Sequence, residues 1–238
     1  MTKNITMRHE LKYICSQKQL DEIKLSLDNV LLPDPNQGEF GYNIKSLYFD
    51  TVGDRLFNET LSGVDNRYKF RIRVYNSSDQ LIKLEKKISI NNLKAKEDLT
   101  ISRKQFINIL DNKYEYGCKL MDEMNCLNKL ELLKPKVIVE YDRYAYVSEI
   151  GNVRITLDRN IRYSKNVYGL FDKDLPTIPI LPINRHILEV KYDGVLPGYI
   201  TKLLNIYKLE RSSFSKYALC RCASLTNGRL EDLYEYWY

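Results

Sequence analysis

The sequence predicts an α+β protein built on an eight-stranded antiparallel β-barrel, a tunnel with helices packed outside it. Three observations lead to this fold class. About eight segments alternate between polar and apolar residues with the period of a β-strand. Several other segments have the spacing of amphipathic helices, whose apolar sides need an apolar partner. The polar faces of the strands are rich in Lys and Arg, so a sheet that closes beneath helices would turn these charges into a lumen.

The first half of the chain is expected to hold five strands and two helices. Ser16 and Gln19 form a capping box for a helix over 17–28, and Ser102 and Gln105 form another for 103–111. The turn residues "NSSD" join two alternating segments into a hairpin. The expected strands cover 7–15, 43–50, 67–75, 80–89 and 91–101.

The second half is expected to hold three strands and three helices. A tight turn, "SEIG", joins a strand over 134–147 to one over 151–163, and the last strand covers 185–194. The expected helices cover 117–131, 197–208 and 214–226. The sequence contains no internal repeat, low-complexity tract or linker, so we expect a single domain over 1–238.

The segment "RYKFRIRVY" at 67–75 shows the charge pattern most clearly. Its four basic residues fall on one strand face, and its apolar and aromatic residues fall on the other. A solvated sheet face is the common explanation of such alternation. Here, however, cations and especially arginines dominate. The polar faces of other strands carry Arg8, Glu10 and Lys12; Lys83, Glu85 and Lys87; Lys94, Lys96 and Asp98; Arg154, Thr156 and Asp158; and Glu189 and Lys191.

A lumen with this lining predicts a polyanionic ligand. Two like charges about 4 Å apart repel by about 4 kcal/mol at an effective dielectric near 20, and burial adds a desolvation cost. A triphosphate or a longer phosphate chain would offset both terms, because arginine forks match phosphate oxygens.

The bulk composition agrees with an anionic partner but does not identify it. The net charge is +6 and the isoelectric point is about 8.9, which suits nucleic acid, a membrane surface or a phosphate metabolite equally. The five cysteines are odd in number and irregularly spaced, and no signal peptide precedes them. We therefore expect a reducing, cytoplasmic location. No apolar run approaches the ~20 residues that span a bilayer.

An ordered series of eight short motifs resembles the triphosphate tunnel metalloenzymes (CYTH-like proteins), and within them the VTC-type polyphosphate polymerase domain. The resemblance covers nearly the whole chain, and its strength lies in the order of the motifs. They are "RHELKY" at 8–13, "SLYFDT" at 46–51, "KFRIRVY" at 69–75, "LEKK" at 84–87, "VEYDRYAY" at 139–146, "VRITLD" at 153–158, "ILEVKY" at 187–192 and "SFSKY" at 213–217.

The resemblance implies roles for individual residues. Glu189 matches the carboxylate that binds an essential divalent metal, Mn²⁺ or Mg²⁺. Ser215 and Lys216 match helix residues that close over the phosphates, and a helix start also offers free N–H groups to an anion. The residues expected to hold and transfer phosphate are Lys12, Arg71, Arg73, Lys87, Arg143, Arg154 and Lys216. The further residues expected to contact substrate are Glu10, Glu85, Lys96, Lys191 and Ser215; Glu10 and Glu85 either assist the metal or pair with tunnel arginines.

Two departures from the family pattern bear on function. The hydrolase and cyclase branch begins with a Glu-x-Glu-x-Lys strand, whereas this chain has Arg8, Glu10 and Lys12. The loss of one carboxylate favours the polymerase-like branch. The related eukaryotic polymerase also carries a lysine where this chain has Ser213, so one phosphate contact is either lost or supplied by Arg211.

The expected function is therefore metal-dependent transfer of the terminal phosphoryl group of ATP to a growing polyphosphate chain. Positioning and electrostatics dominate such chemistry, so it needs no nucleophilic His or Cys. Two alternatives stay open: an inorganic triphosphatase or polyphosphatase, and a non-catalytic polyphosphate-binding module. Binding of single-stranded RNA ranks last, because the aromatic residues of 67–75 lie mainly opposite the cations. No nucleic-acid partner is expected, and a membrane-protein partner is left open.

Overall fold

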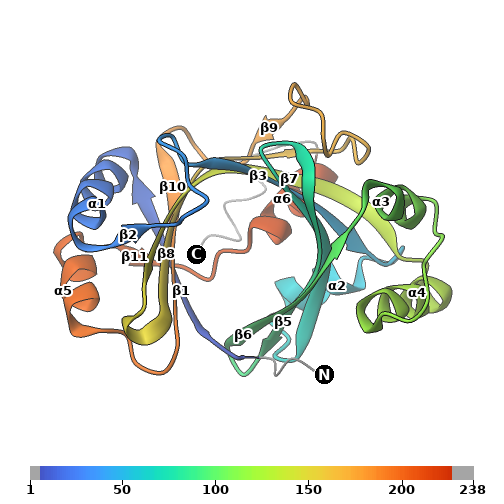
Figure 1. The fold of residues 1–238 in the computed structure, drawn as a ribbon, viewed down its shortest axis with the longest axis horizontal. Coiled ribbons are helices and arrows are strands. Elements are labelled where there is room, and N and C mark those ends of the chain that lie inside the picture. The colour runs from blue at the N-terminus through green and yellow to red at the C-terminus, as the bar shows by residue number, and fades with distance from the viewer. Residues whose placement is uncertain (1–5, 227–238) are drawn as a thin grey trace.

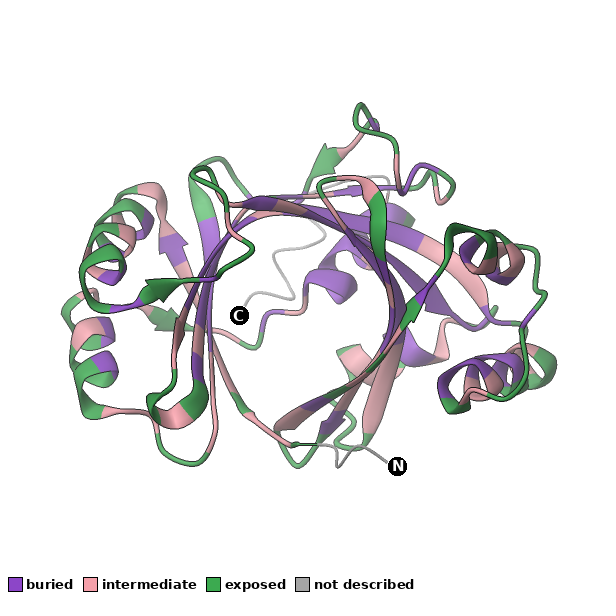
Figure 2. Cartoon of the chain, viewed as in Figure 1, coloured by how far each residue is buried: buried purple, intermediate pink, exposed green. Residues whose placement is uncertain are grey.

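The computed structural model describes residues 6–226 as an α+β fold whose antiparallel sheet curves into a ring (Figure 1). Residues 1–5 and 227–238, the two ends of the expected 1–238 domain, lie outside the described residues. Exposed residues gather on the outer surfaces of the helices and on loops, whereas most strand residues of the ring are buried or intermediate (Figure 2).

Eight long strands make up most of the ring, and each neighbouring pair along it is antiparallel. They lie side by side in the order β1–β10–β8–β7–β3–β4–β5–β6. Their positions agree with the sequence prediction to within a few residues. Their bounds are β1 (His9–Ser16), β3 (Tyr42–Asp50), β4 (Arg67–Tyr75), β5 (Ser78–Ile90), β6 (Leu93–Ile101), β7 (Lys134–Ser148), β8 (Val153–Ser164) and β10 (Arg185–Tyr192).

The sheet of the described residues has eleven strands, so the predicted number of eight is wrong. The three additional strands have only two residues each, too few for an alternating pattern to predict them. They are β2 (Leu32–Pro33), β9 (Ile178–Pro179) and β11 (Glu210–Arg211).

The predicted closure of the barrel is also wrong, because no continuous strand ladder joins β1 to β6. These two strands meet at one isolated bridge, where Arg8 and Lys94 each donate a backbone N–H to the other's carbonyl at 2.9 Å. Farther along, β1 pairs with β11 through Tyr13 and Ile14. The edge of β1 that β6 would need is therefore already occupied there.

The five predicted helices are all present, and both predicted capping boxes are confirmed at Ser16 and Ser102. None of the helices within residues 6–226 is both long and apolar enough to cross a bilayer. The sequence analysis missed α2 (Arg55–Leu61). The other helices are α1 (Gln17–Val30), α3 (Arg103–Leu110), α4 (Lys119–Glu131), α5 (Gly198–Ile206) and α6 (Lys216–Leu225).

Most helices cover the outer, apolar faces of the strands, as predicted. α1 and α5 lie on one side of the ring, and α3 and α4 lie on the other (Figure 1). Leu20 and Ile23 of α1, for example, share a buried cluster with Ile155, Leu188 and Val190 of β8 and β10. The charged faces of these strands are therefore left to line the inside.

α6 differs from the other helices because its first turn contacts the inner face of the ring. The ring of Tyr217 stacks on that of Tyr48 at 4.7 Å. Tyr48 lies on the same face of β3 as Ser46, whose hydroxyl accepts a hydrogen bond from Arg73. The prediction that all helices pack outside is thus wrong for α6, which brings residues 215–217 to the lumen.

Asp50, at the end of β3, joins three elements. It is fully buried, and its carboxylate accepts hydrogen bonds from the backbone N–H groups of Leu56 and Phe57 at 2.9 and 2.8 Å. These are free donors of the first turn of α2. The hydroxyl of Tyr217 in α6 donates to the same carboxylate at 2.5 Å. A residue of the preceding strand therefore caps α2, which explains why the local sequence did not reveal this helix.

We expect Asp50→Ala to lower the free energy of unfolding by about 3 kcal/mol, because it leaves several buried donors without an acceptor. Tyr217→Phe removes one of these bonds and should cost about 1 kcal/mol. Urea unfolding followed by circular dichroism measures both. Asp79→Ala, at an exposed position, serves as the control. If Asp50→Ala is as stable as the control, Asp50 does not hold α2 and α6 to β3 as described.

Candidate functional site

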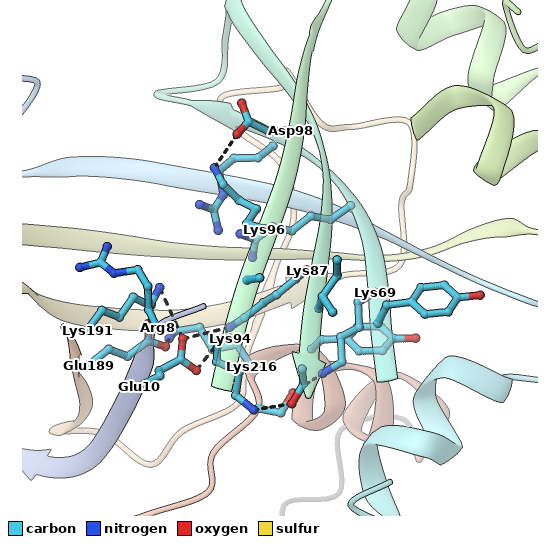
Figure 3. A pocket seen from close by; sticks show the side chains of 18 of the residues that line it. Arg8, Glu10, Lys69, Lys87, Lys94, Lys96, Asp98, Glu189, Lys191 and Lys216 are labelled. Carbon is cyan, nitrogen blue, oxygen red and sulfur yellow. Dashed lines mark hydrogen bonds and ion pairs between the residues drawn. The ribbon is translucent and has the colours of Figure 1, made fainter. Parts of the chain in front are cut away.

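The inside of the ring holds a cavity of about 1310 Å³. Among the described residues, fifteen lysines and arginines line it against four carboxylates, so an anion is the ligand that its charge favours. Of the residues that the sequence predicted to bind phosphate, substrate or metal, only Glu85 does not line the cavity wall. Figure 3 shows several of the side chains pointing toward one another from β1, β5, β6 and β10.

Strand alternation and register bring these charges together. On β4, β5 and β6 the inward positions form cross-strand rows: Lys69 lies opposite Lys87, and Lys87 lies opposite Lys96. In the next row Arg71 lies opposite Glu85. Because side chains of directly opposed residues are close neighbours, the register fixes which charges meet.

Glu85 is a buried partner for the basic residues of β4 and β6. Its carboxylate accepts from Arg71 Nε at 2.6 Å and from Lys96 Nζ at 2.8 Å, and Arg73 Nε lies 3.9 Å away. Arg71 also donates to the hydroxyl of Tyr48 at 2.9 Å. Of the two alternatives left by the sequence, Glu85 therefore takes the role of arginine partner.

A second network joins β7, β8, β10 and α6. Arg143 Nε and Nη2 donate to the two oxygens of Asp158 at 2.6 and 2.7 Å. Lys216 Nζ lies 2.7 Å from Asp158 Oδ2 and 2.6 Å from Glu189 Oε1. Asp158 therefore orients the guanidinium group of Arg143. Glu189 is held by Lys216 of α6 and also lies 3.7 Å from Lys191.

Three lysines from three different strands surround the carboxylate of Glu10. Its carboxylate lies 3.0 Å from Lys12, 3.2 Å from Lys87 and 3.5 Å from Lys191. Only 2% of the Glu10 side chain is exposed. Three cations thus share one negative charge, in contrast to the pairing around Glu85 and Asp158.

The remaining predicted residues lie nearer the edges of the cavity. Arg154 pairs with Asp34 at 2.5 Å and donates to the hydroxyl of Tyr42 at 3.0 Å. Ser215 caps α6 by accepting from the N–H of Ala218, and its hydroxyl also lies 3.1 Å from Lys69 Nζ.

The pKa directions follow from this arrangement. Burial alone would raise the pKa of Glu10, Glu85 and Glu189, but the surrounding cations outweigh it and hold each pKa well below its ordinary value. Burial lowers the pKa of Lys87 to about 7, although Glu10 opposes the shift. Burial and then neighbouring cations lower the pKa of Lys69 well below its ordinary value.

Sequence reasoning left five further basic residues of the cavity without a role. Four of them came from the same alternating strand faces, so the signal was present but was not assigned to individual positions, whereas Lys119 begins α4. Arg8 donates to Asp193 at 2.8 Å. The five are Arg8, Arg67, Lys69, Lys94 and Lys119; Arg211, which the sequence offered as a substitute for a lysine at Ser213, is a sixth basic residue of the wall.

The carboxylates of the cavity suit Mg²⁺ or Mn²⁺ in chemistry, because both ions prefer oxygen ligands. Within residues 6–226 no group of three or more His, Cys, Asp or Glu side chains is arranged to hold a metal. Mg²⁺ commonly uses one or two carboxylates and completes its shell with substrate phosphates and water. Glu189, with Asp158 on the far side of Lys216, fits such a shared site and does not fit an all-protein cage.

A sequence profile of the VTC domain matches residues 7–225. Among curated protein sequences, none shows a significant match to the chain. Similar solved structures include a candidate adenylate cyclase of Bacillus halodurans, with a TM-score of 0.58 and 14% identity over 90% of this chain and 96% of that one. A candidate adenylyl cyclase of Hippeastrum with a dominant triphosphatase activity has a TM-score of 0.52 and 15% identity over 91% and 95% of the two chains. A Pyrococcus horikoshii protein has a TM-score of 0.50 and 17% identity over 93% and 99%.

At such identities the solved structures show a shared fold, whereas the profile spans nearly all of the described residues. A basic cavity inside a ring of antiparallel strands, reached by the first turn of a C-terminal helix, is the arrangement that the eight sequence motifs led us to expect. The chain belongs to the VTC domain family.

Proposed function

We propose that the protein is a polyphosphate polymerase that moves the terminal phosphoryl group of ATP onto a phosphate chain within the basic cavity. The bond between the terminal phosphorus and the ADP oxygen breaks, and a bond to a terminal oxygen of the acceptor chain forms. ADP leaves with the electron pair of the broken bond. The cavity supplies positioning and positive charge, which such transfer chiefly requires.

The observation that carries this proposal is the convergence of Arg71, Arg73, Arg143 and Lys216 in one cavity with Glu189. Arginine forks suit phosphate oxygens, and the carboxylate partners fix the orientation of the forks. Arg143, for example, is held by both oxygens of Asp158. Donors held in place in this way stabilise charge that develops on the transferred group.

A divalent ion would be held by Glu189 together with phosphate oxygens of the substrate. When bound, it would neutralise phosphate charge and act as a Lewis acid. Lys216 lies 2.6 Å from Glu189 in the protein alone. The lysine thus provides the counter-charge of this carboxylate and keeps it ionised.

Hydrolysis is the main alternative, and the Hippeastrum relative is described as a triphosphatase. The low pKa of the cavity carboxylates counts against it here. Activation of water calls for a base whose pKa lies near the working pH, whereas Glu10 and Glu189 both have a pKa well below the ordinary value. A phosphate acceptor already carries its negative charge and needs no such base.

Product analysis tests the proposal directly. Incubation with ATP and Mn²⁺ should give polyphosphate chains, resolved on gels after removal of nucleotide, with ADP in equal amount to the phosphate incorporated. If orthophosphate is the main product, the protein is a hydrolase and not a polymerase. If none of Mn²⁺, Mg²⁺ and Co²⁺ supports turnover, the protein is a non-catalytic polyphosphate-binding module.

Glu189→Gln should lower metal-dependent turnover by about 100-fold or more, because the amide lacks the negative charge that attracts the ion. The fold should persist, since Lys216 keeps Asp158 as a partner. Glu149→Gln, which alters an exposed carboxylate that does not line the cavity, is the control. If Glu189→Gln keeps full turnover, Glu189 is not a metal-binding residue of the active site.

Binding of tripolyphosphate in the absence of metal should weaken by about tenfold between pH 6 and pH 8, because Lys87 loses its proton near pH 7. Lys87→Arg keeps its charge across this range and should remove that dependence. The ligand titrates identically for both proteins, so the ratio of their dissociation constants, measured by calorimetry, isolates Lys87. A ratio that stays constant with pH would contradict the assignment.

A further inference from the structure

Carboxylates neutralise the basic residues of the cavity unevenly. Arg71, Arg143 and Lys216 each have a carboxylate oxygen within 2.6 Å. By contrast, none of Arg67, Lys69 and Lys94 has a carboxylate within ion-pair distance among the described residues, although these three side chains line the same cavity.

The strand register concentrates the cations that lack a carboxylate partner in one part of the cavity. Lys69 lies directly opposite Lys87, and Arg67 lies opposite Ser89, which in turn lies opposite Lys94. Like charges at opposed positions destabilise a sheet. One row farther into the cavity, Arg71 lies opposite Glu85 instead. The excess positive charge therefore gathers near the bridge between Arg8 and Lys94, where β1 and β6 meet.

Within residues 6–226, the close contacts of these three side chains are with uncharged groups. Lys69 Nζ lies 3.1 Å from the hydroxyl of Ser215 and 5.4 Å from the ring centre of Tyr217. Lys94 Nζ contacts the hydroxyl of Ser89 at 2.5 Å, and Arg67 donates to the carbonyl of Val64. Hydroxyls and carbonyls satisfy donors without neutralising a charge, so this part of the cavity gains most from an incoming anion.

We propose that Arg67, Lys69 and Lys94 form, with Lys12 and Lys87, a subsite that takes the end of a condensed-phosphate chain and binds it independently of the arginines deeper in the cavity. Figure 3 shows Lys69, Lys87 and Lys94 around this part of the cavity. The subsite is part of the cavity in which we propose phosphoryl transfer. It depends on that proposed function only for the identification of its ligand as a phosphate chain. A terminal phosphate carries more charge than an internal one, which matches a cluster of lysine point charges.

The related eukaryotic polymerase carries a lysine where this chain has Ser213, and the position of Lys69 indicates which residue replaces it. Lys69 approaches the segment before α6 from β4, and Lys12 Nζ donates to the carbonyl of Phe214 at 2.7 Å. Two cations from the strands thus lie against residues 214 and 215. We assign the missing phosphate contact to Lys69, whereas Arg211 is exposed.

Calorimetry with inorganic pyrophosphate, in the absence of metal and nucleotide, tests the subsite. Lys69→Gln and Lys94→Gln should each weaken pyrophosphate binding by about tenfold, because each removes one charge contact. Lys83→Gln is the matched control, because this lysine is on β5 but pairs with Asp98 at 3.1 Å, and its affinity should stay within about twofold of the wild type.

Thermal unfolding of the ligand-free protein provides a second readout with the opposite sign. Lys69→Gln should raise the melting temperature, because it removes repulsion from Lys87. A loss of binding caused by a damaged fold would lower it instead, and that result would overturn the proposal. Unchanged pyrophosphate affinity in both Lys69→Gln and Lys94→Gln would also overturn it.

These outcomes are separable from the fate of the polymerase proposal. If ATP turnover is absent but both variants lose pyrophosphate, the subsite stands and the polymerase is wrong. If ATP turnover is normal and pyrophosphate binding is unaffected by both substitutions, the polymerase stands and the subsite is wrong.

Discussion

A buried charge needs a partner of opposite sign, and this requirement organises the inside of the ring. Four carboxylates, Glu10, Glu85, Asp158 and Glu189, each lie between basic residues that come from different strands or from α6. The apolar outer faces hold the helices, but these charge networks hold the inward faces of distant strands in a common arrangement. Without them, repulsion between the basic side chains would oppose the closing of the sheet.

The same networks divide the cavity into two parts with different chemistry. Around Asp158 and Glu85 the guanidinium groups are oriented and largely neutralised, which suits recognition of a phosphate group in a fixed geometry. Around Lys69 the charge is in excess, which suits attraction of a flexible anion from solution. A polymer that extends through both parts would meet strong attraction at one end and a fixed geometry of donors at the other. Neighbouring rows of β4, β5 and β6 supply the excess charge and the donors around Glu85, whereas β7, β8 and α6 supply those around Asp158.

Much of this arrangement could be predicted from the sequence. The bounds of β4 agree with the predicted strand at 67–75, and the alternation along it identified the inward face. Closure was predicted wrongly, because β11 pairs with the edge of β1 that β6 would need, and its two residues carry no strand pattern. α2 was missed because its cap, Asp50, lies in the preceding strand. The separation of paired arginines from unpaired lysines depends on which carboxylate reaches which cation across the ring, and a single strand does not contain that information.

The contribution of α6 to the lumen has a consequence for the order in which the protein matures. Lys216 supplies the counter-charge of Asp158 and Glu189, yet it follows both of them, and every long strand of the ring, along the chain. On the ribosome the strands emerge first, so the contacts of Arg143 with Asp158 can form before those of Lys216 with either acid. Docking of α6 is therefore the step that completes the charge network of Asp158 and Glu189.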